Sequence, residues 1–154
     1  MSLLKFPLVA FISFILIGCA ASGPRFSAQA ELHSDSSEII VYRPDRFARG
    51  GVKYLLNLDG KEVATLQNAG FASILTSAGK HELEIHASFF QNFKPMKLLL
   101  DTNSGSRVFV RFEPSISGAP IASPVLIYIP IGYDFIQVPE AQALDDLKDL
   151  KLSK

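Results

Sequence analysis

GKHELEIHA, residues Gly79 to Ala87, is the stretch that decides the fold class. Apolar and polar side chains alternate along it, Leu83, Ile85 and Ala87 against Glu82, Glu84 and His86. A period of two residues is typical of a strand with one face in a core, whereas an amphipathic helix repeats every 3.6 residues. The stretch therefore predicts a β-strand.

The same stretch invites comparison with the His-Glu-x-x-His motif of zinc metalloproteases. That motif needs two histidines four positions apart on a helix, but His81 and His86 are five apart and Ile85 occupies the position of the second ligand. Side chains five positions apart on a strand point to opposite faces, so they cannot share one metal ion. We predict no metal site here, and we expect His81 to hydrogen-bond to the turn that it follows.

Similar runs, separated by turn residues, occupy most of the chain. The predicted strands cover residues 39–42, 52–58, 63–66, 71–76, 82–89, 96–100, 107–113 and 135–138. Asp59-Gly60 is a two-residue hairpin turn, and Pro114 is expected to end the run before it. A leucine stripe after Pro139 predicts a helix over residues 140–152. The fold class predicted is all-β, an antiparallel β-sandwich of about seven to eight strands with a C-terminal helix.

The run from Ile121 to Ile136 is apolar almost throughout and has two interpretations. It either fills the core as a strand buried on both faces or covers a partner. We favour burial, because strands buried on both faces read as continuous apolar runs.

The first nineteen residues predict an export signal that ends in a lipid anchor. Lys5 precedes an apolar stretch from Phe6 to Ile17, too short for a comfortable transmembrane span. The stretch ends in Leu16-Ile17-Gly18-Cys19, which resembles the bacterial lipobox. The resemblance implies cleavage between Gly18 and Cys19 and acylation of Cys19. Ala20 follows, where the inner-membrane retention signal of enteric bacteria would be Asp, so we expect sorting to the periplasmic leaflet of the outer membrane.

This interpretation divides the chain into three parts. Residues 1–18 form the lipoprotein signal peptide, residues 19–37 the lipidated cysteine and a flexible tether, and residues 38–154 the β-sandwich domain with its helix. The tether is predicted from the small and polar residues between Ala20 and Ser37.

Composition excludes several classes of protein. The 154 residues carry 15 basic and 15 acidic side chains, so the strongly basic face of a nucleic-acid-binding protein is missing. Cys19 is the single cysteine, so no internal disulfide can form.

Four short motifs together resemble a known family. They are Ile40-Val41-Tyr42-Arg43-Pro44, Asp59-Gly60-Lys61, Gly79-Lys80-His81 and Gly105-Ser106-Arg107-Val108-Phe109-Val110. In this order they resemble a family of bacterial lipoproteins that carry a domain of unknown function, and residues 58–85 resemble a PEGA-type β-sandwich repeat. The resemblance covers roughly residues 38–138. It implies a fold and a cellular address, without an enzymatic activity.

Catalytic motifs are missing from the sequence, which contains no nucleophile elbow, P-loop or dinucleotide-binding glycine motif. We predict no catalytic residue and no cofactor. The best candidate for partner binding is the loop that begins at Tyr42, where Arg43, Arg46 and Arg49 face only Asp45. Clustered arginines bind phosphate and carboxylate well, so anionic lipid headgroups or a cell-wall polymer are the expected ligands.

The function expected from the sequence is that of a non-enzymatic binding or structural module of the cell envelope. Its partners would be membrane lipid, through acylated Cys19, and an envelope protein or cell-wall component. Two alternatives stay open: an envelope hydrolase or its accessory subunit, with a site assembled from separate loops, and a passive spacer.

Overall fold

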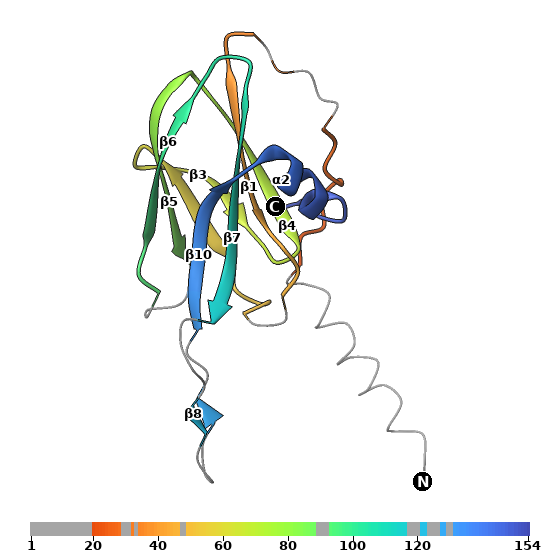
Figure 1. Ribbon diagram of the computed structural model, residues 1–154, viewed down its shortest axis with the longest axis vertical. Coiled ribbons are helices and arrows are strands. Elements are labelled where there is room, and N and C mark those ends of the chain that lie inside the picture. The colour runs from red at the N-terminus through yellow and green to blue at the C-terminus, as the bar shows by residue number, and fades with distance from the viewer. Residues whose placement is uncertain are drawn as a thin grey trace.

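Two packed β-sheets and the short helix α2 make up the fold in the computed structural model (Figure 1). The structure describes residues 20–28, 32, 34–46, 49–88, 93–116, 121–122, 127–128 and 131–154. Within these residues, no helix has the length and apolar character needed to span a bilayer. The predicted signal peptide, Gly18 and Cys19 lie outside the described residues. The mostly β fold predicted from the sequence is confirmed.

The four-stranded sheet has the order β3-β2-β5-β6 and is antiparallel throughout. Its strands are β2 (Tyr54–Leu58), β3 (Lys61–Leu66), β5 (Gly79–Ala87) and β6 (Met96–Thr102). Asp59 and Gly60 join β2 to β3 with positive φ angles of 52° and 80°. These are the angles that a tight two-residue hairpin needs, so the predicted turn is confirmed.

The five-stranded sheet has the order β10-β7-β1-β4-β11. Its strands are β1 (Ser37–Arg43), β4 (Gly70–Thr76), β7 (Arg107–Ile116), β10 (Ile131–Val138) and β11 (Lys151–Leu152). The prediction of a wholly antiparallel sandwich is wrong, because β1 pairs parallel with β7 and β4 pairs parallel with β11. The chain passes through β5 and β6 of the other sheet before β7, so it re-enters beside β1 running in the same direction.

The main core lies between the two sheets. It contains the alternate residues that the sequence pattern assigned to buried faces, among them Leu56, Leu83, Ile85, Val110 and Phe112. An aromatic group joins them, in which the ring of Phe112 lies 4.6 Å from that of Tyr54 and is stacked 5.6 Å from that of Tyr133. The period-two pattern therefore identified the buried faces correctly.

A second core lies on the outer face of the five-stranded sheet, beneath α2 (Glu140–Leu147). Ala143 and Leu147 of the helix pack against Ile40 and Phe109 of the sheet. Because β1 is covered on both faces, it reads as a continuous apolar run rather than an alternating one.

The C-terminal helix is shorter than predicted. It ends at Leu147, and residues 151–152, which were expected to be helical, form β11 on the edge of β4. Leu150 is buried in the second core although it lies beyond the helix. The leucine spacing is compatible with a helix, but the sheet edge at Gly70 and Phe71 offers hydrogen bonds that replace its last turn.

Strand β7 continues past Pro114, where the sequence predicted its end. Pro114 pairs with Tyr133 of β10, and the pairing with β1 reaches only Arg111. Beyond Arg111, β7 has one strand neighbour, and such an edge tolerates a residue without an N–H group.

The apolar run from Ile121 to Ile136 contributes to three strands, β8, β9 and β10, rather than to one buried strand. Strands β8 (Ile121–Ala122) and β9 (Ile127–Tyr128) pair with each other in a two-stranded sheet of their own. Figure 1 shows β8 well below the two large sheets. Strand β10 follows, with Phe135 buried and Ile136 exposed. Among the side chains of this run that the structure describes, the expectation of burial is correct for Phe135, holds in part for Tyr133, which packs against the main core, and is wrong for Ile136.

Residues 20–28, predicted to be part of a flexible tether, lie along the domain. Ala20 forms a bridge with Asn68, and the N–H of Gly23 donates to the carbonyl of Leu152 at 3.0 Å. The ring of Phe26 packs edge-on against that of Phe71 at 5.4 Å. We call residues 20–28 the strap. The prediction of a tether is wrong for the strap because these contacts supply backbone partners and apolar cover that its composition did not reveal.

The two ends of the sandwich differ in how their strands are connected. At one end, the loop end, the connections are residues 44–53, 67–69, 88–95 and 117–130. At the other, the turn end, they are the short turns 59–60, 77–78 and 103–106. The strap begins at the loop end, where Ala20 meets Asn68, and runs towards the turn end, where Arg107 donates to the carbonyl of Ala28.

Candidate functional site: the polar network around Arg46

The predicted binding residues Tyr42, Arg43, Arg46 and Arg49 lie at the end of β1 and in the connection that follows it. The structure does not bring them together on one surface. Tyr42 and Arg43 are neighbours on β1, so they point to opposite faces of the five-stranded sheet. Tyr42 belongs to the second core beneath α2, and Arg43 lies over the ring of Tyr54, a residue of the main core.

Arg43 is fully buried, with 0% of its surface exposed. Its Nη1 donates to the carbonyl of Val52 at 2.8 Å, and its Nη2 donates to the carbonyl of Arg49 at 2.7 Å. Its guanidinium carbon lies 5.1 Å from the ring centroid of Tyr54, a cation–π contact. Burial lowers the pKa of Arg43 from its ordinary value. Arg43 thus fastens the 44–53 connection to the core, and its assignment to a partner-binding surface is wrong.

Arg49 takes part in the same fastening through its main chain. Its carbonyl accepts the bond from Arg43 and a second one from the N–H of Val52. Its φ angle is 62°, a left-handed conformation that costs a non-glycine residue free energy. The two bonds to its carbonyl hold it there.

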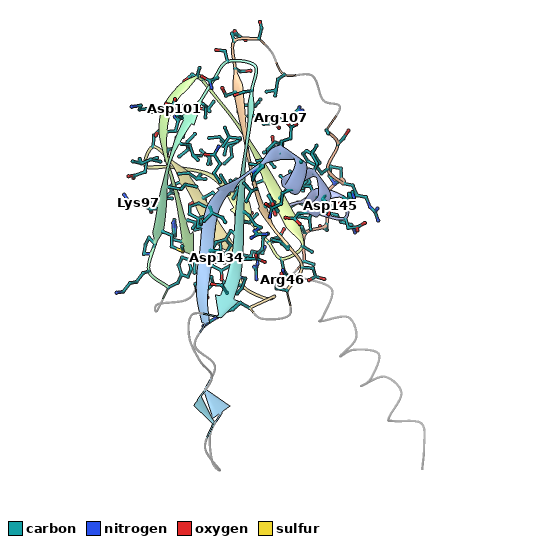
Figure 2. The ribbon with its side chains drawn as sticks, in the orientation of Figure 1. Arg46, Lys97, Asp101, Arg107, Asp134 and Asp145 are labelled. Atoms are coloured by element: carbon teal, nitrogen blue, oxygen red, sulfur yellow. The ribbon has the colours of Figure 1, made fainter. Side chains whose placement is uncertain are left out.

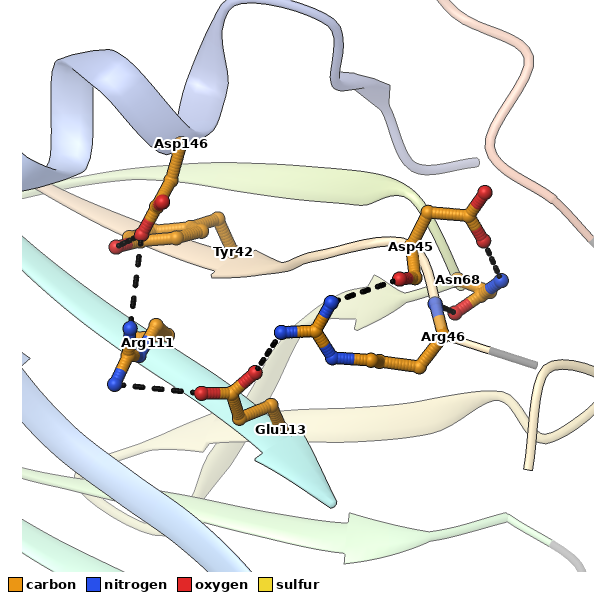
Figure 3. Close-up of polar contacts among 7 residues, drawn as sticks. All are labelled: Tyr42, Asp45, Arg46, Asn68, Arg111, Glu113 and Asp146. Carbon is orange, nitrogen blue, oxygen red and sulfur yellow. Dashed lines mark hydrogen bonds and ion pairs between the residues drawn. The ribbon is translucent and has the colours of Figure 1, made fainter. Parts of the chain in front are cut away.

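Arg46 is the exposed member of the predicted set, with 51% of its side chain accessible. Its Nη2 lies 2.8 Å from Oε2 of Glu113, and its Nη1 donates to the carbonyl of Asp45 at 3.3 Å. Its N–H donates to Oδ1 of Asn68, whose Nδ2 donates to Oδ1 of Asp45 at 2.6 Å. Figure 3 shows these residues as one connected group.

The group extends across the sheet to α2. Glu113 also lies 3.3 Å from Nη2 of Arg111, and Nη1 of Arg111 lies 3.9 Å from Oδ2 of Asp146 (Figure 3). The hydroxyl of Tyr42 donates to the same oxygen of Asp146 at 2.7 Å. Burial and the bond to Asp146 raise the pKa of Tyr42 well above its ordinary value, so it stays a neutral donor.

The polar network is defined as Tyr42, Asp45, Arg46, Asn68, Arg111, Glu113 and Asp146. Its two cations, Arg46 and Arg111, are matched by three carboxylates, those of Asp45, Glu113 and Asp146. Cations and anions alternate along it from Arg46 through Glu113 and Arg111 to Asp146. A cluster of unopposed arginines would attract an anion, but here each arginine faces a carboxylate of the protein. The arrangement joins the 44–53 connection, β7 and α2, and it favours a structural role over anion binding by Arg46 alone.

A second polar site lies at the turn end, where His81 meets Asp59. Nδ1 of His81 is 2.7 Å from Oδ2 of Asp59, and Nε2 is 3.1 Å from the carbonyl of Ser77 and 3.3 Å from Oγ1 of Thr76. Oδ1 of Asp59 accepts the N–H of Glu82. The bond to Asp59 raises the pKa of His81, and the same bond lowers the pKa of Asp59.

Thr76, His81 and Asp59 stand in the order nucleophile, base and orienting carboxylate that acyl-transfer enzymes use. A base must accept a proton at Nε2, but this nitrogen faces the carbonyl of Ser77, which only a ring N–H can satisfy. The geometry favours an imidazolium that clamps two turns. The predicted hydrogen bond from His81 to its turn is confirmed, and the bond to Asp59 is an addition that the sequence did not predict.

His86 lies on the opposite face of β5 from His81, as the strand pattern predicts. His81 is buried towards the core, whereas His86 is 3.8 Å from Glu84 on the outer face. Within the described residues, no group of three or more His, Cys, Asp or Glu side chains is placed to hold a metal ion.

An open groove of about 410 Å³ lies between the edges of the two sheets. It is lined by residues 62–65 of β3, Ala72 and Ser73 of β4, and the C-terminal residues Leu152 to Lys154. Its polar side chains are the hydroxyls of Thr65, Ser73 and Ser153 and the charged groups of Glu62 and Lys154, a set without a histidine or cysteine.

Sequence reasoning missed the carboxylates that neutralise the arginines. Glu113 lies in the predicted strand over residues 107–113, but nothing in the sequence indicated that it would face Arg46. Asp146 lies in the predicted helix over residues 140–152, and nothing indicated that it would meet Tyr42. Comparison of the chain with protein-family models, curated proteins and solved structures gave no match. The resemblance of residues 38–138 to a lipoprotein family therefore stays a prediction.

Proposed function

We propose that this chain is a lipoprotein of the bacterial cell envelope, acylated at Cys19 and held on the periplasmic leaflet of the outer membrane. The observation that carries the proposal is the sequence Leu16-Ile17-Gly18-Cys19 after a charged and then apolar N-terminal segment. Cys19 is also the chain's single cysteine. Several buried acyl chains anchor a protein firmly, because each CH₂ group contributes about 0.8 kcal/mol.

The domain acts as a non-catalytic binding or structural module in this proposal. What supports this role is the use of its polar side chains within the protein. Arg43 bonds two main-chain carbonyls, Arg46 faces Glu113, and His81 links Asp59 to Ser77. Groups engaged in this way hold connections in place and leave little chemistry for a substrate.

The anchor is tested by the substitution Cys19→Ser in the full chain, expressed in a bacterium with the lipoprotein pathway. Incorporation of radiolabelled palmitate and membrane fractionation should both be lost, because the thioether to the diacylglyceryl group cannot form. Ser22→Ala, three residues away and exposed, is the matched control and should keep both. Palmitate incorporation by the Cys19→Ser protein would contradict the anchor.

Sorting is tested separately by Ala20→Asp. In an enteric host this change should move the acylated protein from the outer to the inner membrane fraction without altering palmitate incorporation. If the variant stays in the outer-membrane fraction like the parent, the lipid anchor is unaffected. The inference that Ala20 directs the protein to the outer membrane would then be contradicted.

A binding module and a passive spacer differ in what surrounds the domain. Cross-linking in intact cells should give a discrete adduct of constant size for a binding module and a smear of neighbours for a spacer. The adduct should disappear when an excess of the same protein without a cross-linkable group competes for the partner.

A further inference from the structure

We propose that the loop end of the sandwich lies on the anionic surface of the membrane that holds Cys19, with the sandwich standing end-on and the turn end pointing away. This inference rests on the proposed lipid anchor and adds an orientation and a lipid chemistry to it. It follows from the placement of the strap and from the distribution of charge between the two ends.

The strap fixes where the anchor leaves the domain. A flexible tether of eighteen residues would have a root-mean-square span of roughly 25 Å and would let the domain turn freely. Instead, Ala20 pairs with Asn68 in the 67–69 connection, and Ala21 is buried with its N–H bonded to the carbonyl of Asn68. Cys19 is one peptide bond from Ala20, which is about 3.8 Å between Cα atoms. An acylated Cys19 therefore draws the loop end to the membrane.

Close backbone approach secures the strap. A side chain on Gly23 would place its Cβ 2.5 Å from the carbonyl oxygen of Leu152, and one on Gly70 would place it 2.7 Å from Cβ of Ala21. Glycine at these two positions lets the strap contact β11 and β4 directly. The start of the strap is thus part of the folded domain.

Charge separates the two ends. The connections of the loop end contain Arg46, Arg49, Lys53 and Lys94 against the single acid Asp45. Adding the nearest charged residues of β7 and β10, which are Arg111, Glu113 and Asp134, leaves basic groups in excess. The turns of the other end contain Asp59 and no basic residue. The nearest charged strand residues there are Lys61, Lys80 and Arg107 against Glu38 and Asp101, so this end has no basic excess. Figure 2 shows Arg46 and Asp134 towards the lower end and Asp101 and Arg107 towards the upper end.

Lys53 and Lys94 are the groups that an anionic leaflet would meet. Both are exposed, and they lie in two different connections of the same end. Exposed basic residues near an anionic bilayer are attracted over about a Debye length, roughly 8 Å at physiological salt. The β8–β9 hairpin extends from this end too (Figure 1), with the apolar sequence Ile121-Ala122 paired to Ile127-Tyr128. Basic and apolar groups on one end are what a lipid surface binds.

The orientation is tested with the full-length acylated protein in vesicles of phosphatidylethanolamine and phosphatidylglycerol that contain a lipid with a spin label near its headgroup. One cysteine is introduced for a fluorophore, either Ser88→Cys at the loop end or Ser104→Cys at the turn end, both at exposed serines. The acylated Cys19 has no free thiol to react. The nine residues of β5, at about 3.3 Å each, separate the two ends by roughly 30 Å.

We expect strong quenching of the fluorophore at position 88 and little at position 104. Lys53→Glu with Lys94→Glu should reduce the quenching at position 88 several-fold, because it reverses the charge that faces the lipid. Lys61→Glu with Lys80→Glu makes the same change of charge at the turn end, where both lysines are exposed. This control should leave the quenching at position 88 unchanged. Circular dichroism of each variant confirms that it is folded.

Two outcomes overturn the orientation: equal quenching at both positions, or stronger quenching at position 104. The proposal of an anionic lipid is overturned if the quenching at position 88 is as strong in phosphatidylcholine vesicles as in vesicles with phosphatidylglycerol. It is also overturned if Lys53→Glu with Lys94→Glu leaves that quenching unchanged. Palmitate incorporation is measured on the same samples. Its absence contradicts the anchor itself, whereas palmitate with no difference between the two positions contradicts the orientation alone.

Discussion

His81 links two of the three turns at the turn end, with its Nδ1 2.7 Å from Oδ2 of Asp59 and its Nε2 3.1 Å from the carbonyl of Ser77. The histidine side chain is 10% exposed and the aspartate side chain 51%. The pKa of His81 is raised and that of Asp59 is lowered by this bond. Both shifts mean that the folded protein favours the charged form of each residue.

The first prediction is a loss of stability at alkaline pH. A histidine with a raised folded pKa contributes stability that is complete below its unfolded value of about 6.5 and is lost as pH rises through the folded value. Asp59 contributes stability that is complete above about pH 4 and is lost as pH falls through its lowered folded pKa. The free energy of unfolding, measured with urea at several pH values, should therefore decline above about pH 6.5.

His81→Gln should flatten that decline, because the group that titrates is gone. His86→Gln is the matched control, since His86 lies on the same strand but on the opposite face. A decline that persists in the His81 variant, or that disappears in the His86 variant, would assign the pH dependence to another group.

The strap gives the second prediction. Gly23→Ala places a methyl group within 2.7 Å of both the carbonyl oxygen and Cβ of Leu152, so the strap must shift. Overpacking of this kind costs about 1–3 kcal/mol. Amide hydrogen exchange should become roughly tenfold faster or more at Gly23, Phe26 and Leu152, whose N–H groups bond across this contact. Ser22→Ala, at the exposed neighbouring position, should leave exchange unchanged. Equal protection in both variants would show that the strap does not depend on close approach.

The third prediction compares two arginines three positions apart. Arg43→Met removes the donor to the carbonyl of Val52 and one of the two donors to the carbonyl of Arg49, which keeps the N–H of Val52. The substitution should cost about 1–3 kcal/mol of unfolding free energy. Arg46→Met removes a half-exposed ion pair to Glu113 and should cost about 1 kcal/mol or less. Thermal and urea unfolding measure both. A larger effect for Arg46 would contradict the assignment of Arg43 to the core and Arg46 to the surface.

The fourth prediction concerns the aromatic group between the sheets. Phe112 is fully buried against the rings of Tyr54 and Tyr133, so Phe112→Ala should cost roughly 3–5 kcal/mol. A domain of this size has a free energy of unfolding of about 5–15 kcal/mol in total, so the variant can unfold.

Phe112→Leu keeps most of the volume and should remain folded with a lower melting temperature. Ile136→Ala, at a 44% exposed position on the adjacent strand, should change stability by less than about 1 kcal/mol. Similar melting temperatures for the Phe112 and Ile136 variants would falsify this core.

Local pattern was enough to predict most of the strands. The alternation of Leu83 and Ile85 with Glu84 and His86 identified β5 and its buried face, and Asp59-Gly60 identified a hairpin turn. These are properties of consecutive residues. They depend on the period of the strand and on the φ angles that a turn requires, so distant parts of the chain do not alter them.

The candidate site could not be predicted in the same way. Three arginines within seven positions predicted a basic surface, but Arg43 faces the core and Arg46 faces Glu113, which is 67 positions away. Tyr42 meets Asp146 across 104 positions. A run of residues gives the number of charges, but the partner of each charge is set by which strands become neighbours.

By itself, the sequence determined the period of the strands, the position of the Asp59-Gly60 turn and the separation of His81 from His86. Only the tertiary structure decided that β7 returns parallel to β1, that residues 20–28 lie along the domain, and that Arg43 is enclosed. The physical reason is that the hydrogen-bond partner and the burial of a group depend on which segments the packed sheets place beside it. Those segments are distant in the sequence. Small residues such as Gly23 and Ala21 are typical of a flexible segment until a sheet edge supplies backbone partners, and an arginine is typical of a surface until carbonyl groups surround it.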